Sequence, residues 1–258
     1  MPYELITTYL RLPVLLLVAS RIGGMLMFQP LIGGYGIPRP VQILLILGLA
    51  ALVTPLVKLE AGVPAHPARL MLALGGELLL GILIGLVVRM CFLGLQIGGQ
   101  LIAQESGLAL GEIVDPTTGD EHSSFGSLYL QLGAVIFLIV GGHRVLVAVA
   151  LDTFDTIPLL CDPQALGPGL DLVFDALALG AEIGLRVAAP VLITLFLANA
   201  AMGFVSRTVP QFNVLTVGFS VKGLVVFVLM AVSLPAAFEA FTDALQTTVG
   251  WITELLEP

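Results

Sequence analysis

Long apolar stretches separated by short polar segments dominate this chain of 258 residues. The apolar stretches are rich in Leu, Val, Ile and Ala, whereas the segments between them carry Pro, Gly and Asp, which break helices and form turns. A run of about 20 apolar residues is the length that a helix needs to cross a bilayer. The pattern predicts an all-α, membrane-associated fold, with helices over residues 10–30, 41–57, 70–104, 128–150, 176–206 and 212–234.

Two of these stretches are long for a single straight membrane crossing. Residues 70–104 would form a helix of ~52 Å at ~1.5 Å per residue, whereas the hydrocarbon core of a bilayer is ~30 Å thick. We therefore expect this helix to tilt, to break or to project out of the bilayer. Residues 176–206 contain Pro190, and we expect a kink at that position.

The composition indicates a membrane protein and argues against nucleic acid as a partner. Hydrophobic residues make up 58% of the chain and charged residues 11%, against about 25% charged residues in soluble domains. The formal net charge is −8 and no run of basic residues occurs, which argues against nucleic acid as a partner. No basic residue precedes Arg11, so we expect a retained first helix and not a cleaved signal peptide.

The distribution of basic residues between the apolar stretches does not orient them. With simple alternation of the helices, Lys58 and Arg69 would lie on one side of the membrane and Arg39 and Arg207 on the other. The two sides would carry equal numbers of basic residues, so neither orientation is favoured. Two explanations remain open. Either the loops are too short to carry the signal, or the helices do not cross the bilayer as a regular up-and-down bundle.

Several charged residues lie within or close to the apolar stretches. An uncompensated charge at the centre of a bilayer costs roughly 2.5–3.5 kcal/mol, so these side chains should face protein or water and not lipid. Glu182 and Arg186 are four residues apart with the acid first, which favours an ion pair on one helical face. They could be a satisfied pair inside a bundle or part of a substrate site. The charged residues concerned are Arg21, Glu77, Arg89, Glu182, Arg186 and Lys222.

Small and amide residues recur at helical spacing. Pairs of glycines four residues apart let two helix backbones approach closely where lipid offers no hydrophobic driving force. A stripe of glutamines at the same spacing indicates either hydrogen bonds between helices or a wet channel wall. The glycine pairs are Gly81 with Gly85, Gly94 with Gly98 and Gly180 with Gly184, and the stripe is Gln96, Gln100 and Gln104.

Motifs of catalytic and metal sites are missing from the sequence. It contains no G-x-S-x-G elbow, no H-E-x-x-H and no P-loop, and His66, His122 and His143 lie in different segments without metal-ligand spacing. We therefore expect no catalytic residues, no metal and no cofactor. Transport and assembly are the classes of function that remain.

A polar segment, residues 105–127, interrupts the apolar pattern in the middle of the chain. No Lys or Arg occurs between Arg89 and Arg144, so its acidic residues have no basic neighbour in sequence. The segment is either an ordinary surface connection or the working part of the protein. Its acidic residues are Glu105, Glu112, Asp115, Asp120 and Glu121.

Three segments together resemble the FliR family of flagellar export-gate proteins, whose injectisome relatives are called SctT. They are GLALGEIVDP at 107–116, GGHRVLVAVALDTFDTIPL at 141–159 and PQFNVLTVGFSVKG at 210–223. The resemblance covers essentially the whole chain, and the VDP turn is more similar to the flagellar branch. Ser220 departs from the pattern, because a proline is expected there.

The resemblance implies a place in a larger assembly. Proteins of this family are similar to a FliP-type part followed by a FliQ-type helical hairpin, here about 1–170 and about 171–258. One copy lies beside about five FliP-type and about four FliQ-type subunits in the export gate. The gate conducts unfolded flagellar proteins across the bacterial inner membrane within the basal body. The turn of the hairpin would lie near Arg207–Asn213, where Pro210 ends a helix and Asn213 can cap the next one.

The resemblance also implies a role for the polar segment. A loop that plugs the closed pore corresponds to residues 107–125, where glycines supply backbone freedom and apolar side chains supply the seal. Its candidate residues are Gly107, Leu108, Leu110, Gly111, Glu112, Ile113, Val114, Asp115, Pro116 and Phe125. Candidate contacts with other subunits are Gln96, Gln100, Gln104, Pro210, Asn213 and Lys222.

The alternative function is a secondary transporter for a small solute. Its binding site would use charged residues inside the apolar stretches, with Pro190 marking a broken helix. An inverted repeat between the two halves, typical of many transporters, is not evident. The residues of that site would be Glu77, Arg89, Glu182 and Arg186.

Overall fold

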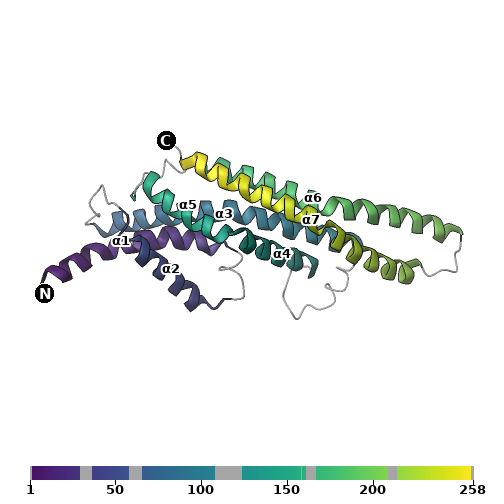
Figure 1. The fold of residues 1–258 in the computed structure, drawn as a ribbon, viewed down its shortest axis with the longest axis horizontal. Helices are drawn as coiled ribbons and strands as arrows, with labels where there is room; N and C mark the ends of the chain where they lie inside the picture. The colour runs from purple at the N-terminus through teal and green to yellow at the C-terminus, as the bar shows by residue number, and fades with distance from the viewer. Residues whose placement is uncertain are drawn as a thin grey trace. The chain divides into compact units, whose positions relative to one another are not determined.

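Seven α-helices make up most of the residues that the structure describes (Figure 1). The structure is a computed structural model, and it describes residues 2–29, 37–57, 66–107, 124–157, 159–160, 167–208 and 214–256. The helices are α1 Pro2–Met27, α2 Arg39–Val53, α3 Pro67–Ser106, α4 Ser124–Val140, α5 Gly142–Thr156, α6 Gly167–Thr208 and α7 Val214–Leu256. No strand occurs in these residues, and the expected all-α fold is confirmed.

The largest differences between the helix boundaries and the apolar pattern lie in the stretch 128–150 and at the end of the last helix. The stretch 128–150 is not one helix but two, α4 and α5, because Gly141 adopts a φ of 80° between them. A left-handed residue ends the regular hydrogen bonding of a helix, and glycine adopts it without a steric penalty. The last helix continues to Leu256, well beyond the expected end at 234, and Pro235 lies inside it. α6 likewise continues as one helix through Pro190.

Three helices are long and apolar enough to cross a membrane among the residues that the structure describes. These segments are Pro67–Ser106, Gly169–Thr208 and Ser220–Glu254, which belong to α3, α6 and α7. α4 and α5 meet the same criteria only when taken together as one broken span, which raises the number to four. α3 has 40 residues, so the expected long third helix is confirmed and it runs without a break.

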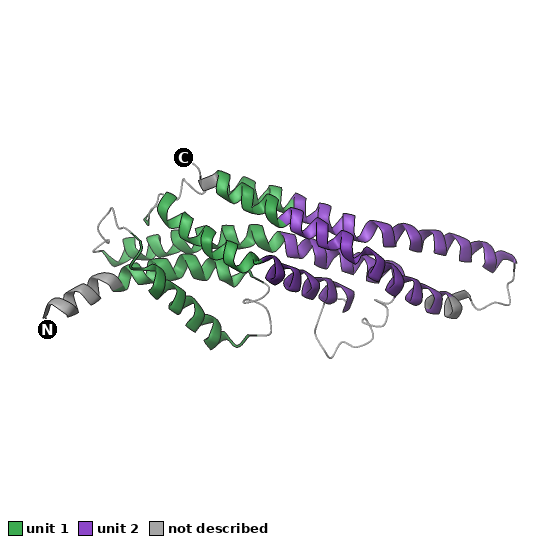
Figure 2. Ribbon diagram, viewed as in Figure 1, with its two compact units in different colours: residues 1–90, 141–177, 245–258 green, residues 91–140, 178–244 purple. Residues whose placement is uncertain are grey.

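Two compact units share the three long helices (Figure 2). Unit 1 comprises residues 1–90, 141–177 and 245–258, and unit 2 comprises residues 91–140 and 178–244. The units therefore do not follow the order of the sequence. The expected division into a FliP-type part and a FliQ-type hairpin rests on resemblance to other subunits and not on compactness. It stays a prediction.

The core of unit 1 depends on close backbone contact between α1 and α3. A Cβ atom added to Gly24 would lie 2.5 Å from the carbonyl oxygen of Leu78, and one added to Gly85 would lie 2.5 Å from that of Met25. Real Cβ contacts are longer, so only glycine fits these places. Gly81 is in the same position against the carbonyl oxygen of Arg21. The expected role of the Gly81 and Gly85 pair in close packing is confirmed.

The core of unit 2 combines a second glycine contact with an aromatic cluster. Gly94 and Gly98 of α3 face Gly180 and Gly184 of α6, so that two pairs of glycines meet across one interface. Nearby, the Phe92 ring lies edge-on to two other rings, with centroids 5.4 Å from Phe137 and 5.0 Å from Phe241. Such edge-to-face contacts add about 0.5–1.5 kcal/mol to the effect of apolar burial.

α2 differs from the other helices because it buries little of its surface. Only Ala50 and Val53 of this helix are buried. Its aliphatic side chains are exposed on several sides, with Leu44 76% and Leu52 71% exposed. A helix that is apolar all round is normally covered by other protein or by lipid.

Candidate functional site

Most of the predicted plug lies outside the described residues. Leu108, Leu110, Gly111, Glu112, Ile113, Val114, Asp115 and Pro116 all fall in the segment 108–123, of which the structure gives no description. Pro210 and Asn213 also lie outside the described residues. The assignment of these positions to a plug and to subunit contacts therefore stays a prediction.

The residue that leads into the segment 108–123 ends α3. Gly107 has a φ of 79°, and its N–H donates a hydrogen bond to the carbonyl oxygen of Gln104 at 3.1 Å. Just before it, Glu105 accepts a hydrogen bond from Nδ2 of Asn199 in α6 at 2.8 Å. Ser106 is fully buried. The segment therefore leaves from a helix end that is attached to α6.

The residue expected to seal the pore at the other end of the segment lies inside a helix. Phe125 belongs to the first turn of α4 and is 7% exposed. Its ring centroid lies 5.7 Å from that of Phe227 in α7. A Cβ atom on Gly99 of α3 would lie 2.5 Å from the carbonyl oxygen of Phe125. Phe125 is thus held by α3 and α7 in this structure and is an anchor for the segment.

The glutamine stripe runs from the interior of unit 2 to its surface. Gln96 is buried, Gln100 is half-buried and Gln104 is exposed. Their graded burial fits neither of the two expected roles better than the other. Lys222 in α7 is half-buried. Whether these side chains contact other subunits stays a prediction.

A buried ion pair in unit 1 joins α1 to α3. Nε of Arg21 donates to Oε2 of Glu77 at 2.6 Å, and the two side chains are 3% and 2% exposed. Both residues were expected to face protein or water because they are charged, and this expectation is confirmed. Their pairing was not expected. They are 56 residues apart, so no local spacing could have indicated it.

The same ion pair binds the end of α5. Nη1 of Arg21 donates to the carbonyl oxygens of Thr153 at 2.8 Å and Ile157 at 3.1 Å. The guanidinium carbon lies 4.5 Å from the ring centroid of Phe154, a cation–π contact. Arg21 therefore caps the end of α5: it donates to the carbonyl of Ile157 and is a second donor to that of Thr153, which also accepts the N–H of Ile157 at 3.0 Å.

The other oxygen of Glu77 binds the backbone that follows α5. Oε1 accepts a hydrogen bond from the N–H of Leu160 at 3.1 Å. Leu160 has a φ of 74°, which a residue with a side chain rarely adopts. The ion pair thus holds the end of α5 and a strained turn against α1 and α3.

The other charged candidates are not assembled into a buried site. Glu182 and Arg186 form the expected ion pair, with Oε1 and Nη2 2.7 Å apart, but their side chains are 54% and 61% exposed. The expectation of a pair inside a bundle is therefore wrong for this chain by itself. Arg89 is half-buried. Both oxygens of Glu77 already accept hydrogen bonds, which leaves it poorly suited to bind a solute.

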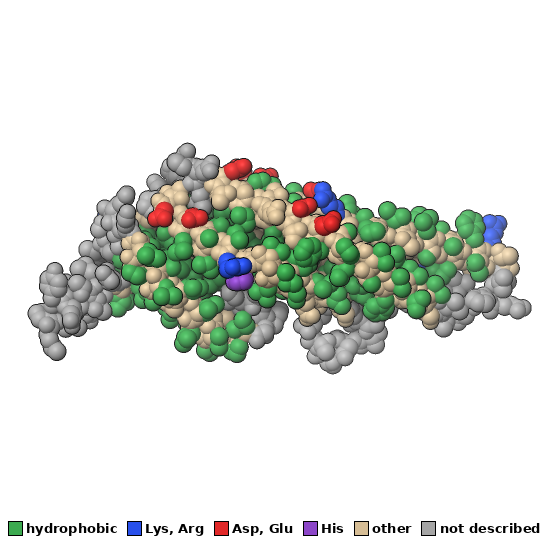
Figure 3. Space-filling view, in the orientation of Figure 1, with side chains coloured by type: hydrophobic (Ala, Val, Ile, Leu, Met, Phe, Trp, Pro, Cys, Tyr) green, Lys and Arg blue, Asp and Glu red, His purple; other side chains and the backbone are tan. Residues whose placement is uncertain are grey.

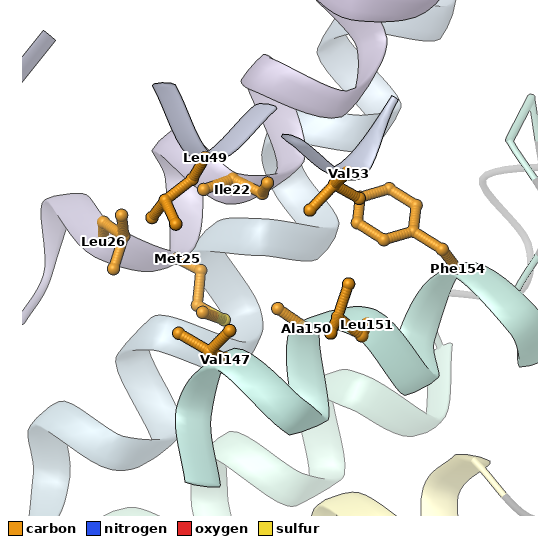
Figure 4. Close-up of a pocket in the computed structure, with 9 residues that line it drawn as sticks. All are labelled: Ile22, Met25, Leu26, Leu49, Val53, Val147, Ala150, Leu151 and Phe154. Carbon is orange, nitrogen blue, oxygen red and sulfur yellow. The ribbon is translucent and has the colours of Figure 1, made fainter. Parts of the chain in front are cut away.

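An apolar hollow lies between α1, α2 and α5 in unit 1 (Figure 4). Every side chain that lines it is apolar, so nothing in its wall could orient a polar ligand. Phe154, which also lies against Arg21, forms one end of the wall. The lining residues are Ile22, Met25, Leu26, Leu49, Val53, Val147, Ala150, Leu151 and Phe154.

Hydrophobic side chains cover much of the molecular surface visible in Figure 3. On α6 and α7, several large side chains are more than 60% exposed, which is far more apolar surface than a soluble monomer shows. Among the described residues, no cluster of three or more His, Cys, Asp or Glu side chains could hold a metal ion. The exposed side chains include Phe196, Leu197, Phe204, Leu224, Phe227 and Val232.

Comparison with known sequences assigns the family. The profile of the family described as bacterial export proteins, family 1, matches residues 12–248. The chain belongs to this family. The match covers parts of all seven helices, so the family assignment applies to the whole fold and not to one motif. The resemblance found from the three sequence segments is confirmed.

The relatives of this chain include flagellar biosynthetic proteins and a Yop translocation protein. The chain is 28% identical over 246 residues to the flagellar biosynthetic protein FliR of Bacillus subtilis, covering 95% of both chains. It is 28% identical over 224 residues to the FliR protein of Escherichia coli, covering 83% of this chain and 82% of that protein. It is 26% identical over 189 residues to the Yop proteins translocation protein T of Yersinia pestis, covering 73% and 72%.

Proposed function

We propose that this chain is a pore-forming subunit of a flagellar type III protein export gate in the bacterial inner membrane. The match of the export family to residues 12–248 carries the proposal. The greater coverage by the FliR proteins of Bacillus subtilis and Escherichia coli than by the Yersinia pestis relative favours the flagellar branch. The apolar helices α3, α6 and α7 suit a membrane-embedded part, and its place would be the basal body.

The surface of α6 and α7 supports a role as one subunit among several. Phe196 is 68% and Phe204 is 74% exposed, and Leu224 and Val232 of α7 are more than 70% exposed. Aromatic and aliphatic side chains at this density are typical of the core of a permanent interface. The proposed partners are about five FliP-type and about four FliQ-type subunits. Unfolded flagellar proteins would pass through the pore, and energy would come from other components.

Co-purification tests this assignment. Affinity purification of the tagged chain, expressed with its chromosomal neighbours and solubilised in a mild detergent, should yield one particle that contains FliP-type and FliQ-type subunits. Mass photometry or native mass spectrometry would give the number of copies of each. A stable monomer or dimer that takes up a small solute when reconstituted would overturn the export-gate function and favour the transporter.

Residues 107–125 are proposed as the plug of the closed pore, with the segment 108–123 as its central part. Replacing this central part with a short Gly-Ser linker, while Gly107 and Phe125 are kept, should leave the assembled gate open to ions. The reason is that the apolar side chains of the segment would no longer obstruct the passage. Ion leakage across the membrane, measured with a potential-sensitive dye in cells or vesicles, gives the result.

A matched replacement separates plugging from assembly. A scrambled segment of the same length and composition keeps the loop but changes where its apolar residues lie. The linker variant should leak strongly and the scrambled variant less. Assembled gates of the linker variant that retain the ion resistance of the unaltered gate would rule out the plug.

A further inference from the structure

The three helices around the buried ion pair of unit 1 are held in two different ways. α1 and α3 touch through their backbones at Gly24, Gly81 and Gly85, and this contact needs no charged side chain. The end of α5, in contrast, is bound to them by polar contacts from the side chains of Arg21 and Glu77. Loss of these polar contacts would leave the α1–α3 contact in place.

α5 has features of a helix that can move. It is preceded by Gly141, whose φ of 80° interrupts the helix between α4 and α5. The apolar hollow lies along one of its sides, so Val147, Ala150 and Leu151 pack incompletely against α1 and α2. At its other end the turn at Leu160 is held in a strained conformation. The break before α5, the hollow beside it and the strained turn after it favour detachment of its end, although Leu146 and Val149 are buried.

We propose that the Arg21–Glu77 pair is a latch for α5: the pair holds the end of α5 and the Leu159–Leu160 turn on α1 and α3, and its release frees them as one unit. The latch is a property of unit 1 alone and would exist whatever the protein exports. It needs an arginine, because three donor contacts reach an acid and two carbonyl groups in different directions. A lysine has one donor nitrogen, so it could keep the contact with Glu77 but could not also reach the carbonyls of Thr153 and Ile157, which Nη1 binds.

Hydrogen exchange measured by mass spectrometry on the full chain, purified with its partner subunits, tests the latch. In the unaltered protein, the amide hydrogens of α5 should exchange together, and they should exchange faster than those of α3 around Gly81. The variant Arg21→Lys should raise exchange at the end of α5 and at Leu160 by about tenfold or more, because hydrogen bonds from a charged donor are lost there. Exchange around Gly81 should change little.

Two further variants make the result decisive. Ala150→Val adds methyl groups into the hollow and should slow exchange in α5, which is the opposite direction. Arg186→Lys makes the same chemical change in the exposed pair with Glu182 and should have no effect. The latch is refuted if Arg21→Lys raises exchange in α1 and α3 as much as in α5, or if α5 and α3 open together in the unaltered protein.

Discussion

Arg21→Leu is expected to lower the free energy of unfolding of the chain by about 3–5 kcal/mol. The substitution leaves Glu77, which is 2% exposed, as a buried carboxylate without its ion partner. It also removes the donors to the carbonyl groups of Thr153 and Ile157. Denaturant titration of the purified chain in detergent, followed by circular dichroism, would measure the loss.

The double variant Arg21→Leu with Glu77→Leu distinguishes the loss of attraction from the burial of a lone charge. Replacing both charged side chains with apolar ones should recover much of the stability, because no uncompensated charge remains. Recovery should be incomplete, since the N–H of Leu160 loses its acceptor. Equal losses in the single and the double variants would mean that the lone carboxylate is not the cause.

Gly94→Ala is expected to destabilise unit 2 by about 1–3 kcal/mol, as overpacking of an interior usually does. The added methyl group would meet the backbone of Gly180, with the carbonyl carbon 3.0 Å and Cα 3.1 Å from the new atom. Backbone atoms cannot give way as a side chain can, so α3 and α6 must move apart. Unfolding of the purified chain in denaturant gives the magnitude.

The same helix offers a control with the opposite sign. Gly76 also lies in α3, but a Cβ atom there would have nothing within 4 Å. Gly76→Ala should therefore stabilise the helix by roughly 0.5–1 kcal/mol, because alanine loses less conformational freedom than glycine on folding. If both substitutions destabilise equally, the contact between Gly94 and Gly180 is not what limits the approach of the helices.

Glycine spacing predicts which positions pack closely but not what they pack against. Gly94 and Gly180 each belong to a pair at spacing four, and the structure brings these two pairs together. Gly81 belongs to a third pair, yet it meets the backbone of Arg21, in a helix without a matching pair. Small residues mark a face on which backbones can approach, whereas the choice of partner depends on the whole fold.

Charge pairs follow the same division between local and distant information. The Glu182–Arg186 contact could be predicted because both side chains lie one turn apart on a single helix. The Arg21–Glu77 contact could not, since it depends on how α1 and α3 meet. The sequence does indicate that each of these charges needs a partner, because each lies in an apolar stretch.

The missed helical residues also have a physical reason. Residues 235–256 contain Pro235 and the acidic residues Glu239, Asp243 and Glu254, so the continuous apolar run ends at Leu234. Their buried positions nevertheless recur at three or four residues, which is the period of a helix with one covered face. These positions are Ala237, Phe241, Ala244, Leu245, Thr248 and Ile252.

For the candidate site, the sequence indicates that Gly107 and Phe125 lie at the ends of the central segment. It could not show that Phe125 is buried, because that depends on contacts with α3 and α7.

α2 sets a condition on how a cell can make this protein. Its aliphatic side chains stay uncovered after unit 1 has folded, with Leu44 and Leu52 among the most exposed. A newly made copy therefore exposes an apolar helix until lipid or another subunit covers it. Copies without that cover would aggregate or be degraded. The steady-state amount of the chain in a cell should then depend on how much lipid or partner subunit is available to cover α2, and not on the rate at which the chain is made.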